Sequence, residues 1–346
     1  MSDPVDERNL AYAKDLHTYF ASIMVDGHAD RVRDAWDWDT SSPQAYADSV
    51  ADNREEWRRL INPPTFQALG PARDVATEVP NGTWLEIDVH EHLKADGILV
   101  VPEGATKLVV FQHGLGSTPE RVFGMGKPGA YHAVGQRLVD AGYAVLAPRN
   151  LYLVEPRNDA ESMAQMVGTT VVGVELARVR VLLDEIAKRH PQLDPDNIAM
   201  TGLSWGGLAT QYWTPLEPRF AVAATIGFYN DRLLKMAADA TDPKFGSFLK
   251  RAEHHAYYWN QLGIFGDTEL ASLVCPRPFL VQHGQRDPIG WAPAIAEEFE
   301  RSRRFWDELG VGDRAEIHIF DGGHEVDTEQ LVRWLGRHFP ADTQGR

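Results

Sequence analysis

Residues 198–207 of the chain read Ile-Ala-Met-Thr-Gly-Leu-Ser-Trp-Gly-Gly, and a helix-favouring stretch follows at 208–210. The apolar run before the glycines predicts a buried strand. A Gly-x-Ser-x-Gly pattern between a strand and a helix is typical of a nucleophile elbow. The turn has to be so tight that Gly202 and Gly206 are needed to remove colliding side chains. We therefore expect Ser204 to be a nucleophile at the carboxyl end of a strand.

The bulk composition is that of an ordinary globular protein. The chain has 346 residues, enough for one large α/β domain or two smaller ones, and 43% of them are hydrophobic. Its formal net charge of −16 argues against nucleic acid or an anionic membrane as a partner, since both would be repelled. With Cys275 as the single cysteine, no intramolecular disulfide can form.

The N-terminal segment gives no sign of export. Residues 1–7 are acidic and lack the basic and then apolar layout of a signal peptide. No apolar run approaches the length of a membrane span. We expect a soluble, cytoplasmic protein.

The chain changes character near residue 65. Apolar residues recur at helical spacing on both sides of a break at 37–43, and Asn-Pro-Pro at 62–64 ends this part. We expect a helical N-terminal extension over 1–65 and a catalytic domain over 66–346.

The second part predicts an α/β fold with a mostly parallel central sheet and helices on both faces. An antiparallel start is expected at 84–92 and 97–101. Strands are expected at 107–112, 143–147, 198–203, 220–228, 279–283 and 316–320, and helices at 131–141, about 160–189 and about 328–339. Between 229 and 273 no clear strand occurs, so we interpret this segment as a small helical lid beyond the strand ends, where ligands of such sheets bind.

A serine nucleophile needs a base, and one of the thirteen histidines has a suitable position. His324 follows the last expected strand and precedes the last helix, after Gly322 and Gly323, which let the loop bend. In a fold of this kind the acid and then the histidine follow the serine along the chain. We therefore expect His324 to be the general base.

The carboxylate that would orient His324 has two candidates. Asp287 follows the penultimate strand and can turn back toward His324, with Pro288 stiffening the exit. Asp231, one strand earlier, is the rival. We favour Asp287, whose role would be to orient the imidazole and stabilise its charged form.

The tetrahedral intermediate also needs hydrogen-bond donors for its oxyanion. One is the backbone N–H of Trp205, directly after the nucleophile. The other is expected in the loop after the strand at 107–112, where Gly114 and Gly116 leave the N–H of Leu115 as the second donor. His113 is interpreted as structural, holding this loop by hydrogen bonds.

These signals, at 112–116, 202–206, 286–288 and 322–324, resemble the α/β-hydrolase fold in kind and order. Within that fold the chain is similar to the dienelactone hydrolase and acetyl xylan esterase branch, through Asp-Pro-Asp-Asn-Ile at 194–198 and Cys-Pro-Arg-Pro at 275–278. The resemblance covers about residues 70–340. It implies a serine esterase that works through an acyl-enzyme without metal or organic cofactor. Dienelactone hydrolases proper use a cysteine nucleophile where this chain has Ser204.

We accordingly expect hydrolysis of a carboxylic ester of a small or medium substrate. The same residues could instead act on a C–C bond beside a carbonyl, a thioester or an amide. The alternative outside the enzymes is a non-catalytic protein of the same fold that binds a ligand. Arg149 and the aromatic lid residues Tyr257, Tyr258 and Trp259 are candidates for substrate binding. A homodimer is an open expectation.

Overall fold

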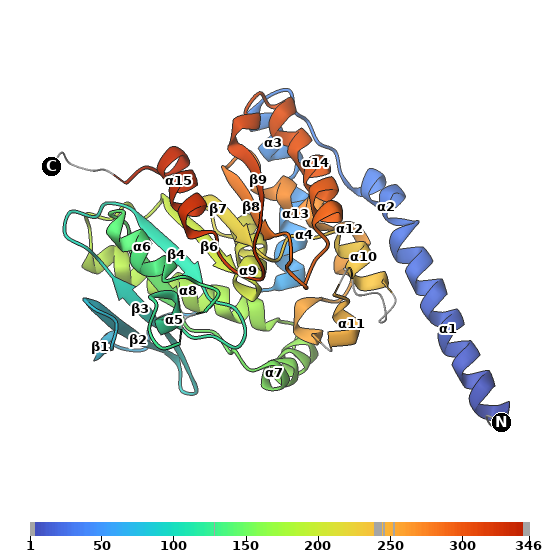
Figure 1. Cartoon of the computed structure of the whole chain (residues 1–346), viewed down its shortest axis with the longest axis horizontal. Coiled ribbons are helices and arrows are strands. Elements are labelled where there is room, and N and C mark those ends of the chain that lie inside the picture. The colour runs from blue at the N-terminus through green and yellow to red at the C-terminus, as the bar shows by residue number, and fades with distance from the viewer. Residues whose placement is uncertain (1–3, 128, 239–243, 245, 252, 342–346) are drawn as a thin grey trace.

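A nine-stranded sheet forms the centre of the described chain, in the spatial order β1-β2-β3-β5-β4-β6-β7-β8-β9 (Figure 1). The computed structural model describes residues 4–341 except 128, 239–243, 245 and 252. The strands are β1 Arg73–Ala76, β2 Gly82–His90, β3 Leu93–Val100, β4 Leu108–Gln112, β5 Ala144–Pro148, β6 Ile198–Leu203, β7 Phe220–Ile226, β8 Phe279–Gly284 and β9 Ala315–Phe320. Strands β1, β2, β3 and β5 pair antiparallel, and β4 to β9 pair parallel. The predicted fold class is confirmed.

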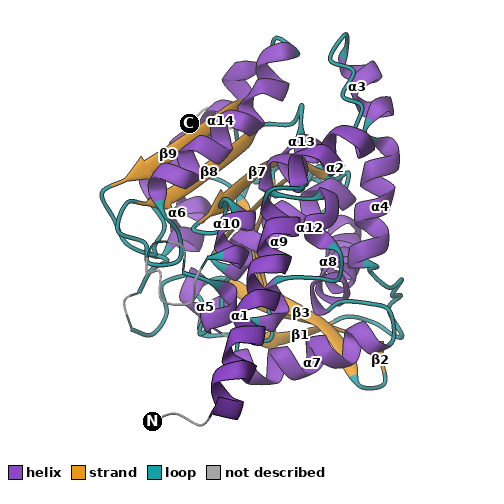
Figure 2. Ribbon diagram, turned by 90° about the vertical axis from the view of Figure 1, so that its right-hand side faces the viewer, coloured by secondary structure: helices purple, strands orange, loops and turns teal. Residues whose placement is uncertain are grey.

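The helices cover both faces of this sheet (Figure 2). They are α1 Pro4–Val25, α2 His28–Ala35, α3 Pro43–Ser49, α4 Ala51–Ile61, α5 Pro119–Val122, α6 Val134–Asp140, α7 Val154–Met166, α8 Val171–Arg189, α9 Trp205–Trp213, α10 Arg232–Ala237, α11 Phe248–Arg251, α12 Gln261–Ile264, α13 Asp267–Val274, α14 Ala292–Glu308 and α15 Thr328–His338. One apolar core joins the sheet to α4, α8, α9, α13 and α14, and a second joins its other face to α6 and α15. Strands buried on both faces explain the near-continuous apolar runs of β4, β5 and β6.

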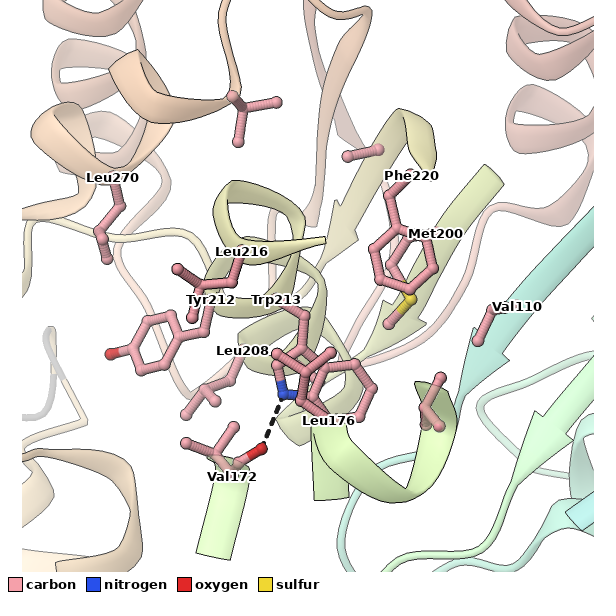
Figure 3. Close-up of a cluster of buried hydrophobic side chains, with 14 of the residues drawn as sticks. Val110, Val172, Leu176, Met200, Leu208, Tyr212, Trp213, Leu216, Phe220 and Leu270 are labelled. Carbon is pink, nitrogen blue, oxygen red and sulfur yellow. Dashed lines mark hydrogen bonds between the residues drawn. The ribbon is translucent and has the colours of Figure 1, made fainter. Parts of the chain in front are cut away.

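Helix α9, which directly follows Ser204, is buried along its whole length (Figure 3). Its last residue, Trp213, packs among buried apolar side chains, and its indole N–H donates to the carbonyl of Val172 at 2.9 Å. A buried indole N–H without a partner would be costly, so this bond fixes α9 against α8. The helix behind the predicted nucleophile is therefore rigidly supported.

The N-terminal helices beyond α1 pack onto the α/β body. Trp57 of α4 is fully buried, donates to the carbonyl of Tyr212 at 3.1 Å and meets the Tyr212 ring edge to face. Trp36 and Tyr46 belong to the same apolar core as the sheet. The division into 1–65 and 66–346 stays a prediction.

The helix expected at about 160–189 is in fact two helices, α7 and α8, and that prediction was wrong. The chain breaks at Gly168, which has a φ of +76°, and restarts at Thr170, whose hydroxyl accepts from the N–H of Gly173 at 3.0 Å. A left-handed glycine ends helices and a threonine N-cap begins them. The apolar spacing continued across both helices and concealed the break.

Candidate active site

Ser204 lies on a strained turn between β6 and α9. Its backbone has φ +63° and ψ −120°, a conformation that non-glycine residues rarely adopt. The N–H of Ser204 donates to the carbonyl of Ile226 on the adjacent strand β7 at 2.8 Å, which holds the turn against the sheet. The strain is thus maintained by the surrounding sheet, as in a nucleophile elbow.

The two glycines of the elbow are required by close backbone approach. A Cβ on Gly206 would lie 1.9 Å from the carbonyl oxygen of Gln112, and one on Gly202 would lie 2.5 Å from the same oxygen. The pairing of β4 with β6 sets Gln112 opposite Gly202 and so brings the two loops together. The predicted reason for glycine at both positions is confirmed.

His324 and Asp287 are hydrogen-bonded. The Nδ1 atom of His324 donates to Oδ2 of Asp287 at 2.7 Å, and the other carboxylate oxygen, Oδ1, accepts the N–H of Ile289 at 2.9 Å. Burial raises the pKa of the Asp287 carboxyl, but the hydrogen bond and charge of His324 outweigh it and leave the pKa below its ordinary value. Asp287 is therefore suited to stay ionised and to hold the His324 ring with Nδ1 protonated.

The alternative carboxylate, Asp231, caps a helix and forms an ion pair. Its Oδ1 accepts the N–H of Leu234 at the start of α10 at 3.0 Å, and its Oδ2 forms an ion pair with Arg301 at 3.2 Å. Both carboxylate oxygens of Asp231 are thus engaged, one at the start of α10 and the other in the ion pair with Arg301. Among the described residues neither oxygen is bonded to His324. Of the two candidates, the geometry brings only Asp287 to the histidine.

Gly227, at the end of β7, leaves room for the pair. A Cβ at this position would lie 3.2 Å from Oδ2 of Asp287, 3.2 Å from Cε1 of His324 and 3.1 Å from Leu203. Its φ of +60° also favours glycine. A side chain here would push the histidine out of its position.

The loop after β4 lies against the elbow. A Cβ on Gly114 would lie 2.9 Å from Cβ of Ser204, and the N–H of Gly114 donates to the hydroxyl of Tyr131 at 2.7 Å. Among the described residues no hydrogen bond is made by the N–H of the next residue, Leu115. That N–H is available to donate to an anion beside Ser204, and its role in the oxyanion hole stays a prediction.

His113 is structural in the observed geometry. It is fully buried, its Nδ1 donates to the carbonyl of Gly114 at 2.9 Å, and its Nε2 accepts the N–H of Asn150 at 3.4 Å. Burial lowers the pKa of this imidazole to about 4, so the ring is neutral at physiological pH. His113 therefore ties the loop after β4 to the loop after β5.

Two cavities meet at Ser204 and Leu115. One has a volume of about 400 Å³ and is lined by His324 and, from the segment before α6, by Gly124, Gly126, Lys127 and residues 129–133. The other has a volume of about 30 Å³ and is lined by Trp205 and by side chains of the 229–273 segment and its neighbours: Phe228, Lys235, Phe248, Glu253, His255, Ala256 and Ile289. The serine thus stands between a wide space and a small one.

Comparison with known proteins shows a family that this chain resembles. Residues 96–254 match the family model described as the dienelactone hydrolase family. Over these residues the chain is similar to the dienelactone hydrolases, and the sheet described above is that of an α/β hydrolase. This confirms the resemblance expected from the motifs and, at the level of the family, the expectation of an enzyme that cleaves esters.

Individual relatives are distant in sequence. The hydrolase is 26% identical over 269 residues to a protein named putative hydrolase YtaP from Bacillus subtilis (strain 168), covering 74% of this chain and 81% of that protein. Its fold is similar to a crystal structure of a putative acetyl xylan esterase from Bacteroides fragilis, with a TM-score of 0.67, 12% identity and coverage of 87% and 90%. A glucuronoyl esterase of carbohydrate esterase family 15 from Caldicellulosiruptor kristjansonii gives a TM-score of 0.61, 17% identity and coverage of 86% and 87%. At these identities the structural likeness establishes the fold.

The residues predicted to bind substrate lie away from the two cavities of the hydrolase. Arg149 forms an ion pair with the buried Asp96 at 2.6 Å and lies over the Trp84 ring. Tyr258 is buried and donates to the carbonyl of His255, whereas Trp259 is 82% exposed.

Tyr257, the third lid aromatic, packs against Phe248 behind the small cavity. None of these four predicted side chains is among the described residues that line either cavity. The prediction of substrate binding therefore finds no support in their positions.

Two polar lid residues at the small cavity were not singled out from the sequence. The Nδ1 of His255 donates to the Asn158 side chain at 2.7 Å, and burial together with the charge of Arg157 lowers the pKa of His255 to about 3. Lys235 is buried and donates from Nζ to the carbonyls of Gly246 and Ile289. The histidine pair at 254–255 was the only signal in the sequence, and it lies in a single short 3₁₀ turn, His254–Ala256, which is too short to show which side chain faces the cavity.

Neither a membrane span nor a metal cluster is found in the described part of the hydrolase. No described helix combines the length and the apolar character needed to cross a membrane. No group of three or more His, Cys, Asp or Glu residues there is arranged to hold a metal ion.

Proposed function

We propose that the hydrolase is a serine esterase that cleaves a small acyl ester through an acyl-enzyme. The observation that carries the proposal is the 2.7 Å hydrogen bond from His324 to Asp287, with His324 and Ser204 lining one cavity. A serine on a strained elbow, a base and an orienting carboxylate are the parts that nucleophilic acyl transfer requires.

In the proposed reaction His324 takes the proton of Ser204 as the hydroxyl attacks the ester carbonyl. The N–H groups of Leu115 and Trp205 stabilise the oxyanion of the tetrahedral intermediate. His324 then protonates the leaving alcohol and, in the second half, removes a proton from water. Asp287 stabilises the imidazolium formed in each half and is not itself protonated.

The different volumes of the two cavities support a proposal for where each half of the ester binds. Because His324 has to protonate the leaving oxygen, the alcohol part occupies the cavity that His324 lines, of about 400 Å³. The acyl part occupies the cavity of about 30 Å³ beside Leu115 and Trp205. The proposed substrate therefore has a short acyl group, of about acetyl size, on a larger alcohol.

The test is labelling with a fluorophosphonate probe, peptide mapping and turnover of p-nitrophenyl acetate. We expect label on Ser204, and Ser204→Ala should lose the label and lower kcat by roughly 10³-fold or more. Ser162→Ala is the matched control, since Ser162 is an exposed serine of α7 that lines neither cavity. It should keep both label and turnover.

The outcomes separate the alternatives. Retention of most of the turnover by Ser204→Ala would overturn the proposed mechanism. Label on Ser204 without ester turnover would keep the nucleophile and point to a C–C bond, a thioester or an amide, with products identified by mass spectrometry. Absence of label together with tight retention of a small ligand would favour the binding-protein alternative.

A further inference from the structure

Helix α1 leaves the body of the molecule with an apolar face uncovered. The 22-residue helix has no buried residue, and in Figure 1 its N-terminal part extends away from the other helices. Tyr12, Tyr19 and Phe20 are 64%, 58% and 61% exposed. Monomeric proteins rarely expose so many large apolar side chains on one element, and such a face marks an interaction site.

The helix is rigidly attached at its C-terminal end. Arg31 donates to the carbonyl of Ile23 at 2.7 Å and, through Nε, to the carbonyl of Gly263 at 2.8 Å. The guanidinium thus joins the last turn of α1 to α12 of the lid segment. This bridge anchors the C-terminal end of α1 to the rest of the molecule, which reduces the entropy lost when the helix binds a partner.

The apolar spacing is that of a coiled coil. Positions 9, 12, 16, 19 and 23 are separated by three, four, three and four residues and hold Asn, Tyr, Leu, Tyr and Ile. This is the a/d alternation of a heptad, with Asn9 at an a position. A single asparagine at an a position specifies how the helices of a coiled coil are aligned and how many of them associate, and it lowers the stability of the coiled coil.

The charges and the exposed apolar area of α1 bear on what kind of partner it can bind. Residues 6–15 of α1 carry three acidic and two basic side chains, so two copies of the helix repel each other little despite the net charge of −16 of the chain. At about 150–250 Å² for a whole aromatic residue, the three exposed rings offer roughly 350 Å². Leu16 and Ile23, which are 37% and 44% exposed, bring this area to roughly 500 Å² per helix, or about 1,000 Å² for a pair of helices, the lower end of specific interfaces.

We propose that α1 is a dimerisation helix that pairs with α1 of a second copy of this chain. A membrane surface is the weaker candidate, because membrane-bound amphipathic helices carry a Lys/Arg-rich polar face and α1 does not. The proposal concerns a face separate from Ser204 and does not depend on the proposed esterase activity.

The test is the molar mass of the full chain by light scattering and its dissociation constant by analytical ultracentrifugation. The wild type is expected to have twice the mass of one chain. Leu16→Glu/Tyr19→Glu should raise the dissociation constant by about 30-fold or more with an unchanged circular dichroism spectrum. Ala11→Glu/Thr18→Glu is the matched control, since both residues are exposed and occupy c positions on the side of α1 away from the a and d residues, and it should remain a dimer.

A second variant tests the core position of Asn9. Asn9→Leu should tighten self-association or raise the number of associated chains, because the buried amide no longer opposes tighter packing. A monomeric wild type, an equal effect of both Glu pairs, or an unchanged dissociation constant for Asn9→Leu would overturn the proposal. Co-sedimentation of the wild type, but not of Leu16→Glu/Tyr19→Glu, with phosphatidylcholine vesicles would assign the face to a membrane and overturn it as well.

Discussion

The guanidinium carbon of Arg157 lies 3.8 Å from the centre of the Trp205 ring, in a position where both side chains are buried. Arg157 also pairs with Glu175, with Nη2 donating to Oε2 at 2.5 Å. The residue next to the proposed nucleophile thus rests on an ion pair between α7 and α8. A desolvated cation over a tryptophan face is among the stronger contacts of its kind.

Arg157→Met should destabilise the fold by about 3–5 kcal/mol, because the buried Glu175 carboxylate would lose its counter-charge. The change is measured as the free energy of unfolding in urea. Arg157→Met/Glu175→Met is the matched comparison, since it removes both charges, and most of the stability should return. If the single and double variants were equally destabilised, the ion pair would not be the cause.

Gly206→Ala should destabilise the protein by about 3 kcal/mol or more and abolish ester turnover, because its Cβ would overlap the carbonyl of Gln112. Gly336→Ala is the control, since Gly336 lies in α15 with nothing within 4 Å of an added Cβ. That change should stabilise by about 0.5–1 kcal/mol through helix propensity. Equal effects of the two substitutions on thermal unfolding would contradict the close approach at the elbow.

Acyl-chain length should control turnover. With about 30 Å³ beside Trp205, acetate esters should be preferred, and each methylene that does not fit should cost roughly 10-fold in kcat/KM. Phe248→Ala should widen this cavity and raise relative turnover of butyrate esters, whereas Leu249→Ala, at a neighbouring half-exposed side chain, should not. A p-nitrophenyl ester series checks this, and faster turnover of octanoate than of acetate by the wild type would refute the assignment of the cavities.

Glu298 should impose a pH dependence on stability. Burial raises the pKa of its carboxyl from 4.5 to about 7. Between these values the folded state binds the proton more tightly than the unfolded state, so the wild-type free energy of unfolding falls as pH rises from 4.5 to 7. The glutamine in Glu298→Gln cannot titrate. The free energy of unfolding of this variant, relative to that of the wild type, should therefore rise from pH 4.5 to pH 7.

Urea unfolding at several pH values measures the effect of Glu298→Gln. The exposed neighbour Glu297 provides the control, and Glu297→Gln should leave the slope of the wild type unchanged. A stability difference between Glu298→Gln and the wild type that stayed constant from pH 4.5 to 7 would show that Glu298 does not titrate there.

Much of the fold and the central residues of the candidate site were accessible from the sequence because the signals are local. The spacing of Gly202 and Gly206 around Ser204 predicts the elbow, since only glycine tolerates the approach of Gln112. The loops holding Asp287 and His324 could be found because each directly follows a strand, and the carboxyl ends of parallel strands meet at one edge of the sheet. The helix break at 167–170 was missed because the apolar spacing ran through it.

The sequence by itself therefore determined the alternating α/β order, the elbow and the chain order of serine, acid and histidine, because each is encoded in a few neighbouring residues. Only the tertiary structure decided which side chains face the serine. Arg149 turns to Asp96, a buried carboxylate that also binds Arg178, and Trp259 points to solvent, while His255 and Lys235 reach the small cavity. The direction of each of these side chains depends on pairing buried charges and polar groups from segments that are distant in sequence, and no local sequence pattern encodes such pairing.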